Sequence, residues 1–492
     1  MRFWGCRMIS ADNPEICKLR GHVMQISAKN TLSRLLLLIL TLSVILSSLC
    51  SCFLFKKQYF AGSEDEIRAN IAASLDGGGE SYKTVQEYLS SWGIPEFDRV
   101  KFRYFESTVN LYYNYAPAPQ VMTHAAELAN IFLDEYYGEI DPADKAEVTN
   151  ALLSCYARTL GDPYAIYRAA EATSDYEVDM SGKFGGIGVM IEYDHVEETL
   201  MVSVVYPDSP AEKAGVEVGD FIVGVDGKRV SDIGYLNAVN HVRGKIGTTV
   251  NITLLRGDRE IEVSAVRAEV EEINVSYDII EEKNLGYVQI IAFKGNTLEQ
   301  FKEAIDALEA AGVAGIIFDL RGNPGGFLDS VVDVISYMIP SGHTIVSYNY
   351  KNMPTTTRKS TDDGDGDHTV NLPMVVIADE YTASAGEIFT AAVRDYRNHN
   401  MLKATIVGTT TFKKGIMQSS FGYKPDGSTL TMTIAFYNPP SGENYHGIGV
   451  SPDREVLLPE PVFDEATGKY LPVHDTQLDA AVEELEKLIN AN

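Results

Sequence analysis

The C-terminal half of the chain alternates between short apolar runs and segments with apolar residues at helical spacing. Met374–Ala378 is entirely apolar and predicts a buried strand, and residues 384–396 after it have the periodicity of an amphipathic helix. The same patterns predict strands at 286–293, 315–320 and 405–407, and helices at 298–310 and 327–338. Strands that alternate with helices in this way predict a layered α/β core.

The preceding part of the chain has different patterns. Between about 180 and 268, short alternating strands separated by glycine turns predict a small β-rich module, with strands at Gly188–Glu192, Leu200–Val205, Phe221–Val225 and Val250–Leu255. From Val121 to Leu160 the apolar positions recur at helical spacing, interrupted at Asp141-Pro142, which predicts a helical hairpin. Residues 353–368 are polar and interrupted, and we expect a loop that covers or borders the functional site.

The segment Leu35–Phe55 contains no charged residue and is long enough to cross a bilayer as a helix. More basic residues precede it than follow it, which favours a cytoplasmic N-terminus and an extracytoplasmic chain from about residue 56 onward. The alternatives are a cleaved signal peptide, or lipidation at the motif Leu49-Cys50-Ser51-Cys52.

Composition narrows the classes of function. With 492 residues the chain should form two or three domains, and 45% hydrophobic residues are ordinary for globular protein. A formal net charge of −28 argues against nucleic acid or anionic lipid as a partner. Only Cys155 of the five cysteines lies beyond the N-terminal segment, so no disulfide framework is expected.

No metal or other cofactor is predicted. The sequence contains no His/Cys cluster with metal-binding spacing and no HExxH motif. The acidic stretch before His368 fails the EF-hand pattern, because the histidine stands where the turn glycine belongs, and a solvated loop is the better interpretation.

Candidate chemistry centres on Ser384, Lys414 and Gln418. Ser384 follows a predicted strand and begins a predicted helix, which would expose its hydroxyl at a helix N-terminus. A lysine can accept the hydroxyl proton only if burial keeps the amine neutral, and a downward pKa shift of about three units costs roughly 4 kcal/mol. If Thr411–Gln418 is extended, Lys414 and Gln418 share one face and Lys413 lies on the other, so glutamine could serve as an uncharged partner of Lys414.

Each of these residues also has a structural interpretation. Ser384-Ala-Gly-Glu387 has the S-x-x-E form of a capping box, and Lys414 alone could be a solvated strand lysine. A third feature weakens these alternatives: the glycine-rich turn 319–326, in which Gly325 and Gly326 could direct backbone N–H groups at an oxyanion together with the amide of Ala385. A plain connection between strand and helix is the alternative for this turn.

The β-rich module resembles a PDZ domain. Phe184-Gly-Gly-Ile-Gly-Val189 is similar to the carboxylate-binding loop, and residues 208–220 are similar to the helix and turn that follow. Successive N–H groups near Gly186 and Gly188 could converge on the terminal carboxylate of a peptide, which would add a strand beside 188–192. The residues expected to bind such a ligand are Gly186, Ile187, Gly188, Val189, Leu236, Val239 and Val242, and the last three would suit an apolar C-terminal side chain.

Residues 120–455 as a whole resemble the C-terminal processing peptidases, also called tail-specific proteases. The segments that carry the resemblance are 160–167, 319–326, 382–388, 411–418, 426–432 and 447–453. It implies Ser384 as nucleophile, Lys414 as general base and Gln418 as its orienting partner, on a crotonase-like αβ core without metal. The family usually has glycine before its catalytic lysine and this chain has Lys413, so the choice of lysine depends on the argument from strand faces.

The resulting interpretation is a multidomain α/β protein. Its expected parts are a cytoplasmic segment 1–34, a transmembrane helix 35–55, a mainly helical region 56–173, a PDZ domain 174–268, a serine protease core 269–460 and a C-terminal extension with a helix, 461–492. We expect protein or peptide substrates with free, apolar C-termini, and the resemblance also implies dimerisation through the N-terminal helices.

Two rival functions remain. A trypsin-like protease with a PDZ domain would need a His/Asp pair and a Gly-Asn-Ser-Gly-Gly motif, and Pro324 stands where that serine would be. A catalytically silent, membrane-tethered adaptor would bind protein tails while the αβ core serves only as a scaffold. The simultaneous presence of Ser384, Lys414 and Gln418 argues against the adaptor.

Overall fold

The computed structural model describes the chain from residue 89 to residue 491, with several short gaps. The described residues are 89–90, 93–94, 96–114, 125–136, 138–194, 199–351, 353–362, 368–459, 463–464, 469–470 and 473–491. None of the helices formed by these residues has the length and apolar character needed to cross a bilayer. The membrane segment expected at 35–55 lies outside the described residues.

The α/β core is built on a six-stranded sheet with the order β10-β11-β12-β15-β16-β19. Its strands are β10 (Val275–Ile280), β11 (Leu285–Ile290), β12 (Ile316–Asp319), β15 (Met374–Ala378), β16 (Ala404–Gly408) and β19 (Arg454–Glu455). All neighbours are parallel except β10 and β11. The predicted layered core is confirmed, and β15 has the bounds expected from the sequence.

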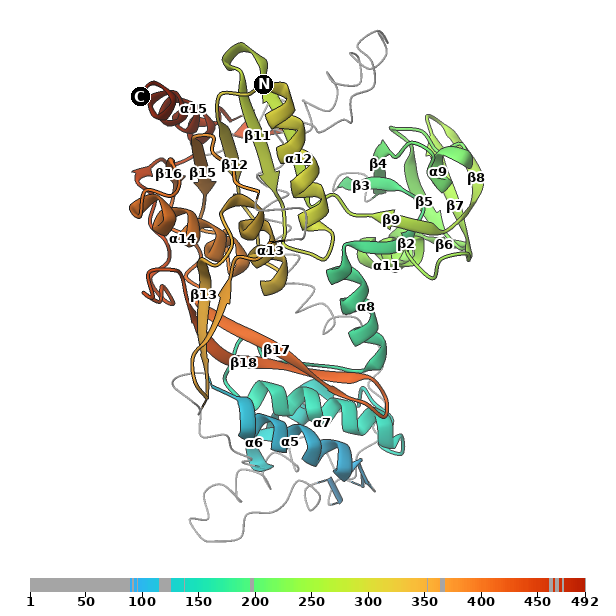
Figure 1. Ribbon diagram of the computed structural model, residues 1–492. Helices are drawn as coiled ribbons and strands as arrows, with labels where there is room; N and C mark the ends of the chain where they lie inside the picture. The colour runs from blue at the N-terminus through green and yellow to red at the C-terminus, as the bar shows by residue number, and fades with distance from the viewer. Residues whose placement is uncertain are drawn as a thin grey trace.

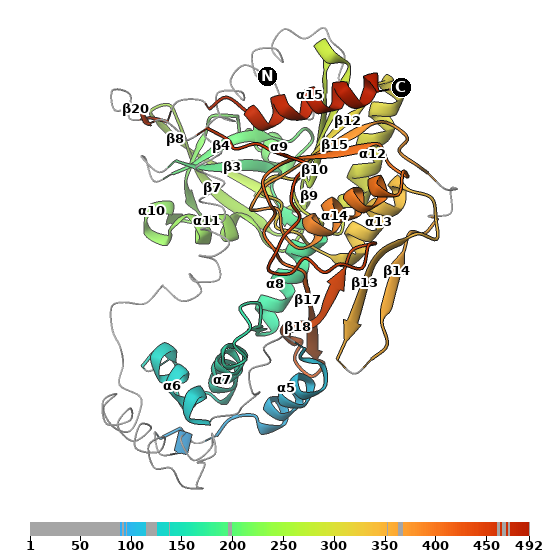
Figure 2. The same cartoon turned by 90° about the vertical axis from the view of Figure 1, so that its left-hand side faces the viewer.

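Both faces of this sheet are covered by helices. Helices α12 (Thr297–Ala311), α13 (Leu328–Met338) and α14 (Ala385–Asn398) lie on one face, and α15 (Thr476–Asn490) lies on the other (Figure 2). The alternation along β15 explains this arrangement: Met374 and Val376 belong to the main hydrophobic cluster, whereas Val375 and Ile377 pack with Leu485 of α15. A strand buried on both faces must be apolar throughout, as this one is.

A second sheet lies below the core and was not predicted. It comprises β1 (Ile166–Arg168), β13 (Thr344–Tyr350), β14 (Thr356–Lys359), β17 (Ile416–Tyr423) and β18 (Ser428–Asn438), with β18 paired to β1, β13 and β17. Part of the segment 353–368, expected to be a loop, forms the strand β14 beside β13. That expectation was wrong for these residues, because pairing with β13 satisfies the backbone of a polar segment as well as water would.

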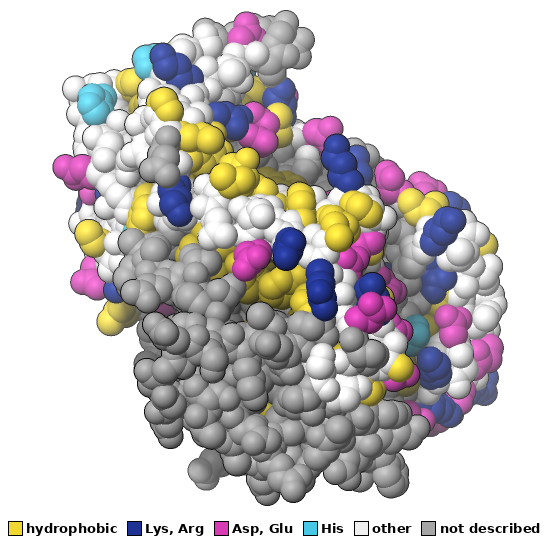
Figure 3. Space-filling model, turned by 90° about the horizontal axis from the view of Figure 1, so that it is seen from below, with side chains coloured by type: hydrophobic (Ala, Val, Ile, Leu, Met, Phe, Trp, Pro, Cys, Tyr) yellow, Lys and Arg dark blue, Asp and Glu magenta, His cyan; other side chains and the backbone are white. Residues whose placement is uncertain are grey.

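The described residues of the N-terminal region include the helices α5 (Arg99–Tyr112), α6 (Ala125–Tyr136), α7 (Lys145–Thr159) and α8 (Ala170–Ser181). The pair α6 and α7 confirms the predicted helical hairpin. Helix α5 packs on the second sheet, where the ring of Tyr112 stacks on Phe421 at 4.8 Å. Seen from below, hydrophobic side chains form a band across the described surface (Figure 3).

The β-rich module forms a separate body beside the core (Figure 1). Its sheet has the order β3-β4-β5-β7-β8, with β6 paired to β5. The elements are β3 (Val189–Asp194), β4 (Thr199–Val205), α9 (Pro210–Lys213), β5 (Phe221–Val225), β6 (Lys228–Arg229), α10 (Val230–Ile233), α11 (Tyr235–Val242), β7 (Thr249–Arg256) and β8 (Arg259–Val266). They enclose a hydrophobic cluster of their own, as expected of an independent domain.

A two-stranded ribbon joins the module to the core. Strand β2 (Lys183–Gly186) enters the module and pairs with β9 (Ala268–Glu271), which leaves it. The buried side chain of Asn296, at the start of α12, donates to the carbonyl oxygens of Gly182 (3.3 Å) and Glu272 (2.7 Å). Both strands are therefore hydrogen-bonded to one residue of the core, at the same end of the ribbon. The remaining short elements are η1 (Glu281–Lys283), β20 (Phe463–Asp464) and β21 (Lys469–Tyr470).

Candidate active site

Ser384 is the last residue before α14 and has an unusual backbone conformation. Its φ of 54° and ψ of −114° lie in a region that non-glycine residues rarely adopt and that costs of order 1–3 kcal/mol. The preceding turn is fixed by Thr382, whose buried hydroxyl donates to the Leu320 carbonyl oxygen at 2.8 Å. The Ser384 side chain remains partly exposed. Strained residues that the surrounding structure holds in place are frequent at functional sites.

The glycine-rich turn lies directly against this serine. A Cβ atom on Gly325 would fall 2.7 Å from the Cβ atom of Ser384 and 2.9 Å from the amide nitrogen of Ala385. The backbone at Gly325, with a φ of 101°, also favours glycine. The buried Asn323 holds the turn in place. Its side-chain Nδ2 donates to Ile290 O at 2.8 Å, and its main-chain carbonyl oxygen accepts a hydrogen bond from Ala383 N at 2.8 Å.

The three amides expected to bind an oxyanion have different surroundings. The N–H of Gly325 donates to Asn323 Oδ1 at 2.8 Å and is therefore not a free donor, which corrects the sequence-based assignment. Gly325 instead allows the turn to lie close to Ser384. The N–H groups of Gly326 and Ala385 have no acceptor among the described residues. These two amides remain the candidates for binding an oxyanion.

Glu387 connects the serine to the lysine segment. Its carboxylate is fully buried and accepts four hydrogen bonds: from Ser384 N (3.0 Å), Lys413 N (2.7 Å), Lys414 N (2.8 Å) and the hydroxyl of Thr411 (2.6 Å). Burial raises the pKa of Glu387, and these hydrogen bonds oppose the shift. The capping box expected as an alternative role of Ser384 is present, and the residue is still partly exposed.

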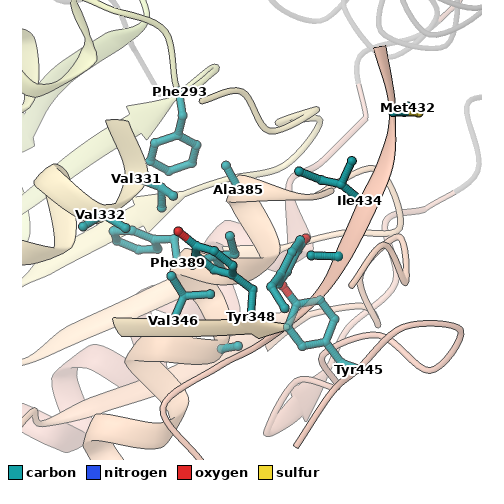
Figure 4. Packing of buried hydrophobic residues seen from close by; sticks show 14 of the residues in the cluster. Phe293, Val331, Val332, Val346, Tyr348, Ala385, Phe389, Met432, Ile434 and Tyr445 are labelled. Carbon is teal, nitrogen blue, oxygen red and sulfur yellow. The ribbon is translucent and has the colours of Figure 1, made fainter. Parts of the chain in front are cut away.

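Sequence reasoning recognised Glu387 only as a helix cap. One signal for its larger role was available: an acidic residue on the buried side of an amphipathic helix must find several donors. Ala385 and Phe389, on the same helix, belong to the hydrophobic cluster beneath the site (Figure 4).

Lys414 and Lys413 differ sharply in their surroundings. Burial lowers the pKa of Lys414 to about 8, with the Asp162 and Glu387 carboxylates opposing the shift. Its Nζ atom lies 4.2 Å from the centre of the Tyr164 ring. The side chain of Lys413 is exposed and its φ is 81°. Tyr164 and Asp162 lie in the segment 160–167, which carries part of the family resemblance. Their position near Lys414 was not predicted.

The argument that placed Lys414 and Gln418 on one strand face does not hold. β17 begins at Ile416, the backbone at Lys413 is left-handed, and the pairing register shifts between Met417 and Gln418. The Gln418 amide nitrogen donates to the hydroxyl of Thr433 at 3.0 Å, and no hydrogen bond joins it to Lys414, both residues being described. The orienting role expected for Gln418 is therefore absent from this conformation.

The glycine-rich turn 319–326 is further supported by an ion-pair network. Arg321, which is buried, contacts Asp319 at 2.6 Å and Asp475 at 2.8 Å, and the hydroxyl of Tyr287 donates to Asp319 at 2.6 Å. Asp475 is the N-cap of α15, so the C-terminal helix is tied to the same turn that carries Gly325. Buried charges that are paired in this way resist displacement of the turn.

The groove expected in the β-rich module has an open strand edge. Among the described strands, β3 is hydrogen-bonded to β4 and forms the outer edge of its sheet. The side chains of Ile187 and Val242 are buried in the hydrophobic cluster of the module, Val189 and Val239 are partly buried beside it, and Gly188 has a φ of 77°. Gly186 lies in β2, and the side chain of Leu236 lies outside the described part of the chain. In the described residues, no group of three or more His, Cys, Asp or Glu side chains is arranged to hold a metal ion.

Comparisons with known proteins identify the family. The sequence profile of peptidase family S41 matches residues 284–456, and that of a PDZ domain matches residues 201–256. The carboxy-terminal processing protease CtpA of Bacillus subtilis is 34% identical over 327 residues, which cover 66% of this chain and 67% of the relative. The chain belongs to peptidase family S41. The predicted family and enzyme class, a serine peptidase, are thereby confirmed, as is the PDZ domain.

The chain is also similar to a further curated relative and to a solved structure. A probable CtpA-like serine protease of Staphylococcus haemolyticus is 34% identical over 327 residues, 66% of this chain, but the match spans only 63% of the length of that relative. A solved structure of a photosystem II D1 C-terminal processing protease covers 78% of this chain and 95% of its own, with 24% identity and a TM-score of 0.42.

Proposed function

We propose that this S41 member is an extracytoplasmic, membrane-anchored serine endopeptidase that recognises protein C-termini and cleaves by a Ser384/Lys414 pair. The observation that carries the proposal is the buried carboxylate of Glu387, which binds the main-chain N–H groups of both Ser384 and Lys414 and so brings the two segments together. The lowered pKa of Lys414, about 8, gives it an appreciable uncharged fraction at neutral pH.

In the proposed reaction, the hydroxyl oxygen of Ser384 attacks the carbonyl carbon of the substrate while uncharged Lys414 accepts the hydroxyl proton. The carbonyl oxygen becomes an oxyanion within reach of the N–H groups of Gly326 and Ala385. Lys414 then returns its proton to the leaving amine, and the peptide bond breaks. A water molecule, deprotonated by the same lysine, hydrolyses the acyl-enzyme and regenerates Ser384.

The PDZ domain would supply the selectivity for C-termini. The free edge of β3 can accept an added strand, and Val239 and Val242 of α11 pack with the domain's apolar cluster. An apolar terminal side chain would suit such a groove, and the chain upstream of it would extend to Ser384. We also propose that ligand binding to this domain realigns Lys414 with Ser384.

Degradation of an unfolded protein with an apolar C-terminus tests the peptidase function. The wild-type protein should cleave it, and Ser384→Ala should lower the rate by at least about 10³-fold. Equal rates in the two proteins would instead support the silent adaptor. A trypsin-like alternative has lost its basis, because residues 284–456 match family S41.

The same assay tests tail recognition. A substrate whose final apolar residues are replaced by acidic ones should be cleaved more slowly at low concentration, with KM raised and kcat less affected, since the PDZ domain contributes binding. No change in KM would contradict the role of the PDZ domain. The membrane-anchored, extracytoplasmic location is tested by the accessibility of the C-terminal helix to external protease in intact cells.

A further inference from the structure

A loop far along the chain holds the main chain around Lys414. We define the clamp loop as residues 437–447, which comprise the last two residues of β18 and the segment after it. Its members bind all three carbonyl oxygens of residues 413–415: Gly447 N donates to Lys413 O (2.9 Å), the Tyr437 hydroxyl donates to Lys414 O, and Asn444 Nδ2 donates to Gly415 O (3.0 Å). The clamp loop thus satisfies three consecutive carbonyl groups that lie outside regular secondary structure.

The N–H groups of the same three residues are also bound. Those of Lys413 and Lys414 donate to Glu387, and that of Gly415 donates to His446 Nδ1 at 3.3 Å. A Cβ atom at Gly415 would lie 2.7 Å from the backbone nitrogen of His446, so the two segments are in close contact. The lysine segment is therefore fixed by Glu387 on one side and by the clamp loop on the other.

Tyr437 is the member of this loop nearest to the chemistry. Its side chain is 2% exposed, and its ring packs edge-on against Tyr445, with ring centres 5.8 Å apart. Burial raises the pKa of the Tyr437 phenol far above its usual range; the Glu387 carboxylate adds to this shift, and the side chains of Tyr445 and Ser384 oppose it. The phenol is thus a permanent donor, with Ser384 as a neighbour.

We propose that Tyr437 is a positioning residue for the Ser384/Lys414 pair. By fixing the carbonyl of Lys414, its hydroxyl directs the lysine side chain into the buried position over the Tyr164 ring. This inference rests on the proposed function, because positioning has meaning only if Lys414 is the base.

The adjacent lysines explain why this chain requires such a residue. Lys413 has a φ of 81°, which lysine rarely adopts, and its side chain is exposed. Relaxation of that backbone would rotate the following peptide plane and withdraw Lys414 from its site. The bond from Tyr437 to the Lys414 carbonyl opposes this movement, because it anchors the next peptide unit.

The neighbouring tyrosine provides a matched control. Tyr445 is 3% exposed and lies in the same loop, but its buried hydroxyl makes no hydrogen bond to the lysine segment, both being described. Tyr437→Phe and Tyr445→Phe each remove one buried hydroxyl from the same cluster, and only the first removes the bond to Lys414.

The first experiment measures peptide cleavage by both variants as a function of pH. Tyr437→Phe should lower kcat by about 10-fold or more with KM changed less than about threefold. The midpoint of its pH profile should move upward from about 8, because a less buried lysine holds its proton more tightly. Tyr445→Phe should retain both values. Equal midpoints and equal kcat for Tyr437→Phe and wild type would overturn the proposal.

A second experiment measures the protonation of Lys414 without catalysis. In the Ser384→Ala protein, the rate at which an amine-reactive reagent modifies Lys414 is followed by mass spectrometry across pH, with and without Tyr437→Phe. An upward shift of the midpoint supports positioning even if the wild-type protein cleaves no peptide, in which case the proposed function alone fails. An unchanged midpoint overturns the positioning role. Should Tyr437→Phe not fold, Asn444→Ala removes the adjacent bond to Gly415 and is judged by the same two outcomes.

Discussion

At the scale of single residues, the site depends on a glycine whose lack of a side chain leaves room for Ser384. Ser384 adopts its strained backbone against Gly325, where no side chain can be accommodated. A neighbouring glycine, Gly322, also has a positive φ of 71°, but it faces open space. Substitutions at these two glycines of one turn therefore distinguish the effect of backbone strain from the effect of steric contact with Ser384.

Gly325→Ala is expected to lower kcat/KM by on the order of 10²-fold, because its Cβ atom would displace Ser384 or the amide of Ala385. Gly322→Ala should cost about 1–2 kcal/mol in the free energy of unfolding and leave the activity of the folded protein nearly unchanged. Peptide cleavage and thermal unfolding of both variants provide the measurement. Equal activity losses would show that strain in the turn, rather than contact with Ser384, is responsible.

At the scale of elements, the sequence predicted the connection from β15 to α14 closely. An unbroken apolar run and an amphipathic helix are strong local patterns, and they agree with the structure within about two residues. The strands β13, β14, β17 and β18 were not predicted as a sheet, because their pairing joins residues far apart in sequence and leaves no local period to detect.

The candidate site shows the same division between local and long-range information. Ser384, Lys414 and Ala385 were selected from motifs, and Glu387 was recognised only as a helix cap. The contacts of Tyr164 and Tyr437 with Lys414 join residues far apart in sequence, and no spacing reveals them. The predicted pairing of Lys414 with Gln418 failed because it assumed a regular strand where the chain has a left-handed residue and a bulge.

Helix α15 belongs to the core because it covers a sheet face that would otherwise meet water. Leu485 is fully buried against that face, and Lys487, two residues later, is exposed. Leu485→Ala should lower the free energy of unfolding by about 2–5 kcal/mol, and Lys487→Ala by less than about 0.5 kcal/mol. Chemical denaturation of the two variants checks this difference. A small effect of Leu485→Ala would mean that α15 is dispensable for the core.

At the scale of the whole molecule, one junction connects the PDZ domain to the peptidase core. Asn296 is 1% exposed and binds Gly182 and Glu272 at the core end of the β2/β9 ribbon, while the side chain of Asn274 donates to its Oδ1 at 2.9 Å. Through Asn296, a reorientation of the PDZ domain would therefore be transmitted to α12 and the sheet. The proposed communication between ligand and active site should depend on this side chain.

Asn296→Ala should abolish the effect of a C-terminal peptide ligand on peptidase turnover while leaving ligand affinity unchanged, because the groove is formed by other residues. Asn237→Ala is the control, since that exposed amide bonds within the PDZ domain to Ile233 O. Turnover is measured with and without the peptide. A ligand effect as large in Asn296→Ala as in wild type would contradict communication through this junction.

The central claim for the whole protein is that an uncharged Lys414 removes the proton of Ser384. The most direct measurement is the rate at which a serine-reactive organophosphonate modifies Ser384 as pH is raised. The lysine acts as a base only after losing its proton, so the rate should rise with pH through a midpoint near 8, persist in Lys413→Ala and nearly vanish in Lys414→Met. A midpoint near the ordinary lysine value of 10.5, or an equal rate in Lys414→Met, would contradict the account.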